Sequence, residues 1–280
     1  MPVPTHPGVD LSIDAAAVEA ILTGFIADET RRTGLNRVVV GLSGGLDSAV
    51  AAALACRALG RRGVIAVSMP HARSHPSSLR HARALARGLG IRIEEFDITP
   101  MLEAYFVRDA GAGRLRRGNK MARERMSILY DRSAVHEALV LGTSNKTEIL
   151  LGYGTVHGDM ASSINPLGDL YKTQVRSMAA HLGIPAAIRR RAPTADLWPD
   201  QTDEEDLGYT YAALDPLLHL MVDQRWTRRE ILDAGWPRRM VDHVLATMRR
   251  TQFKRRMPLI AKVSARTIGM DFRYPRDWGT

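Results

Sequence analysis

Residues 43–48, with the sequence Ser-Gly-Gly-Leu-Asp-Ser, follow the apolar run 38–42 and precede the helix-forming stretch 49–59. This order predicts a strand, a tight glycine turn and a helix. The first N–H groups of a helix have no partners inside it and lie at the positive end of its dipole. Two glycines let the backbone curl closely around an anion, so the sequence predicts a phosphate site where this strand ends.

Asp47 distinguishes this turn from two other phosphate loops. The turn is not a Walker A motif, because no Gly-Lys-Ser/Thr closes it, and it lacks the third glycine of a dinucleotide-binding turn. A carboxylate beside bound phosphates repels them unless a divalent cation lies between the two. We therefore interpret residues 43–48 as a triphosphate cradle that carries its own Mg²⁺ ligand. The alternative is that Asp47 only complements the helix N-terminus. The pattern resembles the pyrophosphate loop of the N-type ATP pyrophosphatases, which cleave ATP between the α- and β-phosphates.

Apolar runs alternate with helix-length segments through the first half of the chain. Strands are expected at 38–42, 64–69, 91–98 and 138–141. Continuous apolar strands between helices indicate βαβ units and a parallel sheet, which binds ligands beyond the carboxyl ends of its strands. The alternation predicts the α/β class, with a Rossmann-like parallel sheet and helices on both faces. The resemblance of residues 43–48 to the loop of the N-type ATP pyrophosphatases implies the adenine nucleotide alpha hydrolase-like fold.

The whole chain, 1–280, is predicted to form a single domain. Residues 1–13 are rich in proline and expected to be loose, whereas 209–280 are expected to form a helical and basic C-terminal part. Two long stretches, 108–118 and 189–208, are rich in Gly, Pro and charge. We expect both to be irregular and to cover a bound nucleotide, because long loops inside a compact domain are usually lids or disordered.

Composition narrows the classes of function. Lys and Arg number 39 against 30 for Asp and Glu, and the net charge of +9 suits polyanions such as ATP, dinucleotides or RNA. Cys56 is the single cysteine, so no disulfide forms within the chain, and a buried thiol is expected rather than a nucleophile. No apolar run is long enough for a membrane span, and the start lacks a leader pattern. These features predict a soluble cytoplasmic protein with no membrane partner.

Several further segments resemble NAD synthetase in the order expected for that family. The resemblance begins near residue 14 and reaches the C-terminus, which makes it more specific than the glycine turn alone. The chain is most similar to the synthetase portion of the glutamine-dependent members. The tail of those members also contains Arg-Tyr-Pro, which this chain has at residues 273–275. The chain has neither the length nor the cysteine for their glutaminase domain. The segments are RGNKMARERM (117–126), GTSNKTE (142–148), GYGTVHGD (152–159), YKT (171–173), APTADL (192–197) and FKRR (253–256).

The resemblance implies a role for each matching residue. Asp47 and Glu148 would hold Mg²⁺, and both would act in catalysis together with Lys172. Contacts with ATP are implied for Gly41, Leu42, Ser43, Gly44, Gly45, Leu46, Asp47, Ser48, Thr143, Lys172 and Thr194. Contacts with deamido-NAD are implied for Asn119, Arg123, Glu148 and Lys254. Glu148 also stands three residues after Asn145, which is capping-box spacing at a helix start and is compatible with metal binding.

The same resemblance implies the reaction and the partners. NAD synthetases convert deamido-NAD to NAD with ATP and an ammonia source, through an acyl adenylate that releases pyrophosphate and then AMP. We expect free ammonia, or ammonia from a separate glutaminase, and we assign no base for ammonium. A homodimer is implied, with sites near the subunit interface. Asp14 is predicted to cap a helix that runs to about Arg32, and this amphipathic helix is a candidate for part of that interface.

Two other functions remain open at this point. The first keeps the adenylation chemistry but uses another carboxylic acid. The second is a tRNA-modifying ATP pyrophosphatase, which the basic charge and the shared loop favour. The single cysteine and the lack of a recognisable RNA-binding module argue against it, so no nucleic-acid partner is expected.

Overall fold

The computed structural model describes residues 8–198, 200–256, 259–268 and 271. The first seven residues, part of the segment expected to be loose, and the Arg-Tyr-Pro sequence at 273–275 lie outside these residues. Within the described part, no helix combines the length and the apolar character that a membrane span requires.

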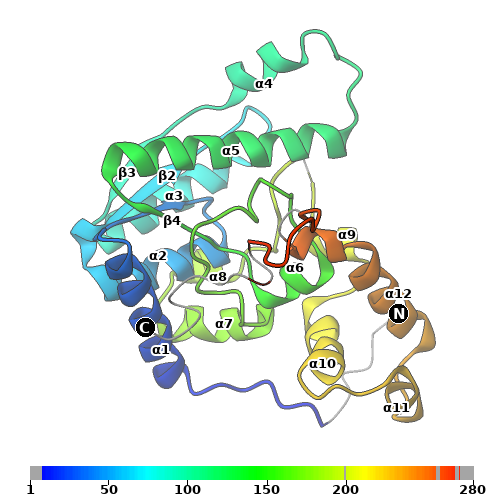
Figure 1. Ribbon diagram of the computed structural model, residues 1–280. Coiled ribbons are helices and arrows are strands. Elements are labelled where there is room, and N and C mark those ends of the chain that lie inside the picture. The colour runs from blue at the N-terminus through cyan, green and yellow to red at the C-terminus, as the bar shows by residue number, and fades with distance from the viewer. Residues whose placement is uncertain (1–7, 199, 257–258, 269–270, 272–280) are drawn as a thin grey trace.

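A parallel sheet of four strands forms the centre of the fold (Figure 1). The strands lie in the order β3, β2, β1, β4, and each neighbouring pair is parallel. The predicted α/β class and all four strands are confirmed, although β3 is shorter than expected. The bounds are β1 (Val38–Gly41), β2 (Val64–Ser68), β3 (Arg92–Glu95) and β4 (Leu139–Leu141).

Helices cover both faces of the sheet, because successive side chains of a strand point to opposite sides. Val38 and Val40 of β1 belong to the apolar cluster that contains α1 (Ala15–Arg32), α2 (Leu46–Leu59), α3 (Pro76–Leu89) and α7 (Lys172–His181). Val39 belongs to the cluster on the opposite face, with α4 (Thr99–Phe106) and α5 (Arg114–His136). All three valines are fully buried, so the apolar run correctly predicted a strand covered on both sides.

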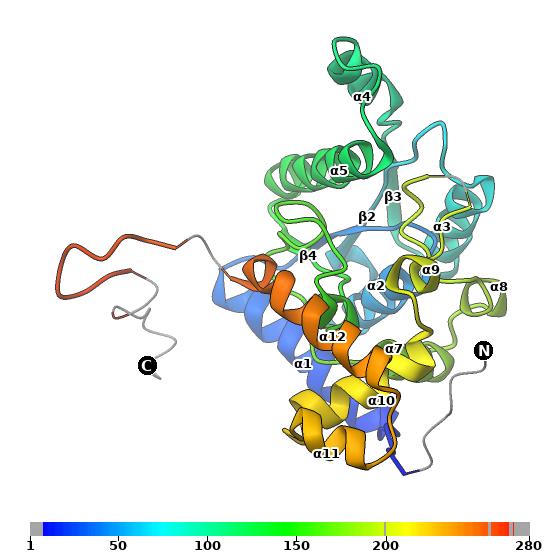
Figure 2. The same ribbon diagram turned by 90° about the vertical axis from the view of Figure 1, so that its right-hand side faces the viewer.

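The C-terminal helices form a further apolar cluster beside the sheet (Figure 2). Leu151 and Tyr171, at the end of α6 and just before α7, pack into this cluster. The helical character predicted for 209–280 is confirmed from Tyr211 to Arg255, whereas the described residues 259–268 are not helical. The single domain over 1–280 stays a prediction. The remaining elements are α6 (Lys146–Leu151), α8 (Ala186–Arg189), α9 (Asp203–Leu207), α10 (Tyr211–Val222), α11 (Arg228–Asp233), α12 (Arg238–Arg250) and the 3₁₀ turns η1 (Arg61–Gly63) and η2 (Gln252–Arg255).

Helix starts are where the structure corrects the sequence analysis. Helix α1 begins as predicted, with Asp14 accepting hydrogen bonds from the N–H groups of the second and third following residues. Helix α2 begins at Leu46, three residues earlier than expected, so Asp47 lies in its first turn. The expectation of irregular structure is wrong for 114–118, which belong to α5, and for the residues of α9.

Gly118 explains why the start of α5 was missed. Glycine inside a helix is unfavourable and is read as a loop signal. Here a side chain would meet Leu197 at 3.0 Å and Trp198 at 3.3 Å, so the glycine permits the segment before α9 to pack closely on α5. Helix α9 is short, and Thr202 caps it by accepting a hydrogen bond from the N–H of Glu205 at 3.3 Å.

Candidate active site

The turn after β1 has the geometry of an anion site. Gly44 has a φ of 76°, and an added Cβ would lie 2.2 Å from the carbonyl oxygen of Ser78, so only glycine fits. The hydroxyl oxygens of Ser43 and Ser48 lie 3.1 Å apart, and the Ser43 hydroxyl accepts a hydrogen bond from the Gly45 N–H at 3.2 Å. Gly45 gives α2 no side-chain cap. The first turn of α2 therefore presents free N–H groups to a ligand.

A cavity of about 750 Å³ opens beside this turn at the carboxyl end of the sheet. Segments that follow β1, β2 and β4 line it, as expected for a doubly covered parallel sheet. Its volume is in the range of nucleotide and cofactor sites. Every residue predicted to contact ATP lines this cavity except Gly44, which fits against Ser78 instead.

Lys172 joins the two predicted acidic residues. Asp47 follows β1 and Glu148 follows β4, and these strands are neighbours in the sheet. The ammonium nitrogen of Lys172 lies 2.5 Å from Asp47 Oδ2 and 3.3 Å from Glu148 Oε1, and the lysine is only 3 % exposed. The structure thus brings together all three residues for which the sequence predicts catalytic roles.

Asn145 holds the other oxygens of both carboxylates. Its side-chain Nδ2 donates to Asp47 Oδ1 at 3.0 Å, and its backbone N–H donates to Glu148 Oε2 at 3.2 Å. Its Oδ1 accepts from the N–H of Glu148 at 3.0 Å, which completes the predicted capping box of α6. A single buried residue therefore holds both acids, Asp47 through its side chain and Glu148 through its backbone N–H.

The charge states of these groups depend on one another. Burial raises the pKa of Glu148 to about 8, opposed by the charge of Lys172 and reinforced by those of Asp47 and Asp203. Burial alone would lower the pKa of Lys172, but the charges of Asp47, Glu148 and Asp203 outweigh burial and raise it. Lys172 is therefore a permanent cation surrounded by acidic groups.

Asp203 is a member of the site that the sequence analysis missed. It is the first residue of α9, is 3 % exposed and lines the cavity. The hydroxyls of Tyr153 and Tyr211 donate to its two carboxylate oxygens at 3.1 and 3.0 Å. Burial raises the pKa of Asp203, and its charge acts on Lys172. The cap pattern of Thr202 and Glu205 was the one sequence signal for this helix.

The residues predicted to contact deamido-NAD are only partly gathered at the cavity. Asn119 lines it and accepts a hydrogen bond from the Thr155 hydroxyl at 2.9 Å. Lys254 also lines it, and its ammonium donates to the carbonyl oxygens of Gly152 and Gly154, both at 2.8 Å. Lys254 thus secures the loop after α6. The structure does not bring Arg123 to the cavity, and its contact with deamido-NAD stays a prediction.

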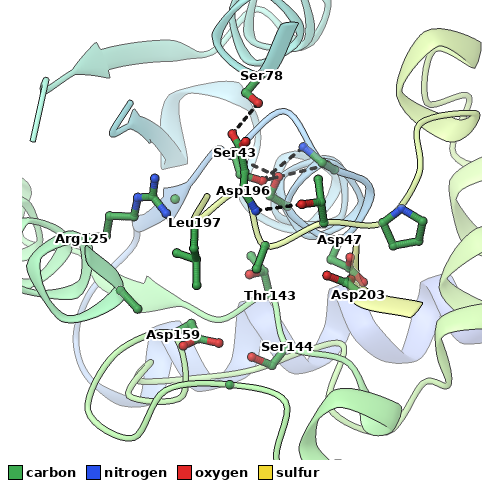
Figure 3. Close-up of a pocket in the computed structure, with 18 of the residues that line it drawn as sticks. Ser43, Asp47, Ser78, Arg125, Thr143, Ser144, Asp159, Asp196, Leu197 and Asp203 are labelled. Atoms are coloured by element: carbon green, nitrogen blue, oxygen red, sulfur yellow. Dashed lines mark hydrogen bonds between the residues drawn. The ribbon is translucent and has the colours of Figure 1, made fainter. Parts of the chain in front are cut away.

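Arg125, two residues after Arg123, occupies the cavity instead. Arg123 is exposed and donates to the carbonyl oxygen of Val156 at 3.1 Å, whereas Arg125 lines the cavity and donates to that of Met69 at 3.2 Å. Figure 3 shows Arg125 and Asp159 toward one end of the cavity. Burial lowers the pKa of Arg125 and raises that of Asp159.

Asp196 closes one wall of the cavity. Its carboxylate accepts a hydrogen bond from the hydroxyl of Ser78 at 2.7 Å (Figure 3). It also accepts one from the N–H of His75 at 3.0 Å. Arg191 also donates to the Ser78 hydroxyl, at 2.9 Å. Thr194, a predicted ATP contact, lies in the same segment and accepts from the N–H of Asp196 at 3.0 Å. These bonds attach the segment before α9 to the start of α3.

Together, the parallel sheet, the uncapped start of α2 and the buried group of acids around Lys172 define an ATP-using enzyme of the adenine nucleotide alpha hydrolase-like fold. The family model described as NAD synthase matches residues 18–258. The chain therefore belongs to the NAD synthase family.

Individual relatives agree with this assignment. The chain is 51 % identical over 269 residues to the NH(3)-dependent NAD(+) synthetase of Trichlorobacter lovleyi, covering 96 % of this chain and 98 % of the relative. Among solved structures, it is similar to an NH3-dependent NAD synthetase from Campylobacter jejuni, with a TM-score of 0.76, 31 % identity and coverage of 90 % and 100 %. It is also similar to an NMN synthetase from Francisella tularensis, with a TM-score of 0.79, 30 % identity and coverage of 89 % and 99 %.

Proposed function

We propose that this protein converts deamido-NAD to NAD with ATP and ammonia, releasing AMP and pyrophosphate. Support comes from relatives named NH(3)-dependent NAD(+) synthetase that match nearly the whole chain. The structural observation that carries the proposal is the position of Asp47 and Glu148. They follow neighbouring parallel strands, they share the Lys172 ammonium, and Asp47 lies in the uncapped first turn of α2.

The donor set fits a divalent cation. Asp47 and Glu148 each point one carboxylate oxygen at the same buried positive charge, and oxygen ligands of this kind are those that Mg²⁺ prefers. We propose that these two residues hold Mg²⁺. When bound there, the ion supplies positive charge against the phosphates that leave.

The chain's own residues account for the first half of the reaction. A carboxylate is a poor electrophile, so deamido-NAD must first gain a leaving group. We propose that its carboxylate attacks the α-phosphorus of ATP and that pyrophosphate departs onto the turn of residues 43–48. The N–H groups at the start of α2 and the ammonium of Lys172 stabilise the charge that develops on the leaving oxygens. The product is an acyl adenylate.

The second half requires ammonia to enter and water to stay out. Ammonia attacks the activated carbonyl, and AMP leaves. The wall that Asp196 attaches to Ser78 and His75 restricts access from that side, which protects the adenylate from hydrolysis. We assign no residue as the base that deprotonates ammonium.

We also propose a homodimer, the use of free ammonia or of ammonia from a separate glutaminase, and the cytoplasm as the compartment. The dimer is supported by apolar side chains on the surface of α1, where Ile21 is 68 % and Phe25 is 38 % exposed. Leu115 of α5 is 71 % exposed and also lines the cavity, so a partner that covered it would lie next to the substrates.

A second acid substrate has one observation in its favour. The Francisella tularensis structure described as an NMN synthetase has a TM-score of 0.79 with this chain, so the mononucleotide of nicotinic acid is a candidate in place of deamido-NAD. The family match argues against the tRNA-modifying alternative.

The test is mass detection of products from ATP, Mg²⁺, ammonium and each acid in turn. We expect NAD and AMP in equal amounts from deamido-NAD. A clear preference for the mononucleotide would transfer the proposal to that substrate. The absence of any amide product would refute the proposed function.

A further inference from the structure

The buried ammonium of Lys172 occupies the space between the two carboxylates. Lys172 is the first residue of α7, and its side chain is 3 % exposed. Its nitrogen lies 2.5 Å from Asp47 and 3.3 Å from Glu148. A divalent cation bound by both acids needs oxygen distances of about 2.0–2.6 Å, and therefore needs this same space. The lysine and the metal cannot both sit between the acids.

No other described cation contacts this pair of acids. The remaining oxygens of Asp47 and Glu148 are held by Asn145, which is uncharged. Among the other cations of the cavity, Arg125 and Lys254 bond to backbone carbonyl oxygens, as described above. Removal of Lys172 would leave two buried acids, with Asp203 close by, and no cation among them. Such a group attracts any small cation strongly.

A bound triphosphate competes with the two carboxylates for the ammonium of Lys172. It brings several negative charges to the start of α2, within the same cavity that Lys172 lines. The lysine has a long flexible stem, so its ammonium can turn from the carboxylates toward the phosphates. The space between Asp47 and Glu148 is then open to a metal that the phosphates also attract.

We infer that Lys172 is an internal stand-in cation that keeps divalent metal out of the Asp47–Glu148 pair until a nucleoside triphosphate draws its ammonium away. This inference rests on the proposed metal site. It adds that the nucleotide must displace the Lys172 ammonium before the metal can bind between Asp47 and Glu148. Metal and nucleotide bind together, whereas either one alone binds weakly. By linkage, the factor by which the nucleotide strengthens metal binding equals the factor by which the metal strengthens nucleotide binding.

The test measures the metal alone, with no nucleotide and no turnover. Mn²⁺ is titrated into the full chain, and free Mn²⁺ is followed by its electron paramagnetic resonance signal. The variants are Lys172→Met, which removes the cation at similar size, and Lys172→Arg, which keeps it. Lys120→Met is the matched control, because Lys120 pairs with Glu124 on α5 and does not line the cavity.

We expect Lys172→Met to bind one Mn²⁺ per chain at least ~10-fold more tightly than the wild type, a coupling of ordinary size. Lys172→Arg and Lys120→Met should match the wild type. Equal affinities for the wild type and Lys172→Met would overturn the inference. An equal gain in Lys120→Met would also overturn it, because net charge would then be the cause.

A second comparison does not depend on whether Lys172→Met folds. Asp47→Asn should leave Mn²⁺ binding by the nucleotide-free protein unchanged, because no metal occupies the pair in that state. Loss of one bound Mn²⁺ in this variant would show that the wild-type pair already holds metal, contrary to the inference. Either failure would leave the proposed function standing, since NAD formation is measured separately.

Discussion

Asn145 offers a quantitative test of how the two acids are positioned. It is fully buried, it caps α6, and its Nδ2 donates to Asp47 at 3.0 Å. Serine is also a good cap, but its side chain is too short to replace the bond to Asp47. A hydrogen bond to a charged group contributes about 1.5–3 kcal/mol. The Asp47 side chain is 17 % exposed, which moves the expectation toward the lower value. Asn145→Ser should therefore lower the free energy of unfolding by about 1.5 kcal/mol.

Asn145→Ala should lower the free energy of unfolding further than Asn145→Ser does, because it also removes the side-chain cap of α6. The additional loss is about 1 kcal/mol, measured as the difference between the two variants in urea unfolding. If the Asp47 position matters fully in the transition state, Asn145→Ser should reduce kcat by about tenfold per 1.4 kcal/mol. Asn36→Ala is the control, since Asn36 is exposed, and it should change stability by less than about 0.5 kcal/mol. Wild-type stability and wild-type kcat in Asn145→Ser would refute this account of Asn145.

Three further predictions address the turn, the wall and the thiol. Gly44→Ala should abolish ATP binding in calorimetry, because its Cβ would collide with a carbonyl oxygen at 2.2 Å. Gly88→Ala is the control in α3, where an added Cβ meets nothing. It should raise the free energy of unfolding by about 0.5–1 kcal/mol and leave ATP binding unchanged, and wild-type ATP binding by Gly44→Ala would contradict the geometry. Asp196→Ala should admit water to the adenylate, so that more AMP than NAD is formed. An AMP-to-NAD ratio of one in this variant would show that the cavity wall at Asp196 is not needed to exclude water. Cys56 is half-buried rather than fully buried as the sequence predicted. This partial burial still raises its pKa from 9.0 to about 11, so the folded protein keeps a proton that the unfolded chain loses. The free energy of unfolding should therefore fall as the pH rises from about 9 to about 11. Alkylation of Cys56 in the folded protein should be slow at neutral pH. Equal alkylation rates before and after unfolding would contradict the burial.

Local patterns in the sequence were sufficient for the centre of the fold. The strand, turn and helix around residues 43–48 were predictable because apolar runs, glycines and dipole physics all act over a few residues. The pairing of Asp47 with Glu148 was implied by the resemblance to NAD synthetase. The rule that parallel strands end at one edge of the sheet accounts for the segments after different strands lining one cavity. In the structure, Asp47 lies in the first turn of α2, after β1, and Glu148 in the first turn of α6, after β4, and these two strands are neighbours in the sheet.

Other parts of the site depend on contacts that no local pattern contains. Asp203 lies in a charged segment whose sequence is typical of a solvated loop. In the structure it is buried and accepts hydrogen bonds from Tyr153, in the loop after α6, and from Tyr211 of α10. The choice between Arg123 and Arg125 is a matter of helix rotation, since residues two apart face in different directions. The amphipathic pattern of α5 is too weak to decide which of the two faces the cavity.

The transfer of one carboxylate oxygen tests the central claim most directly. Deamido-NAD labelled with ¹⁸O in its carboxylate is incubated with the protein, ATP, Mg²⁺ and ammonium, and the products are weighed by mass spectrometry. Attack on the α-phosphorus predicts one ¹⁸O in AMP for each NAD formed, none in pyrophosphate, and no products with Asp47→Asn. Label in pyrophosphate, or NAD formed alongside unlabelled AMP, would contradict an acyl adenylate made at the start of α2.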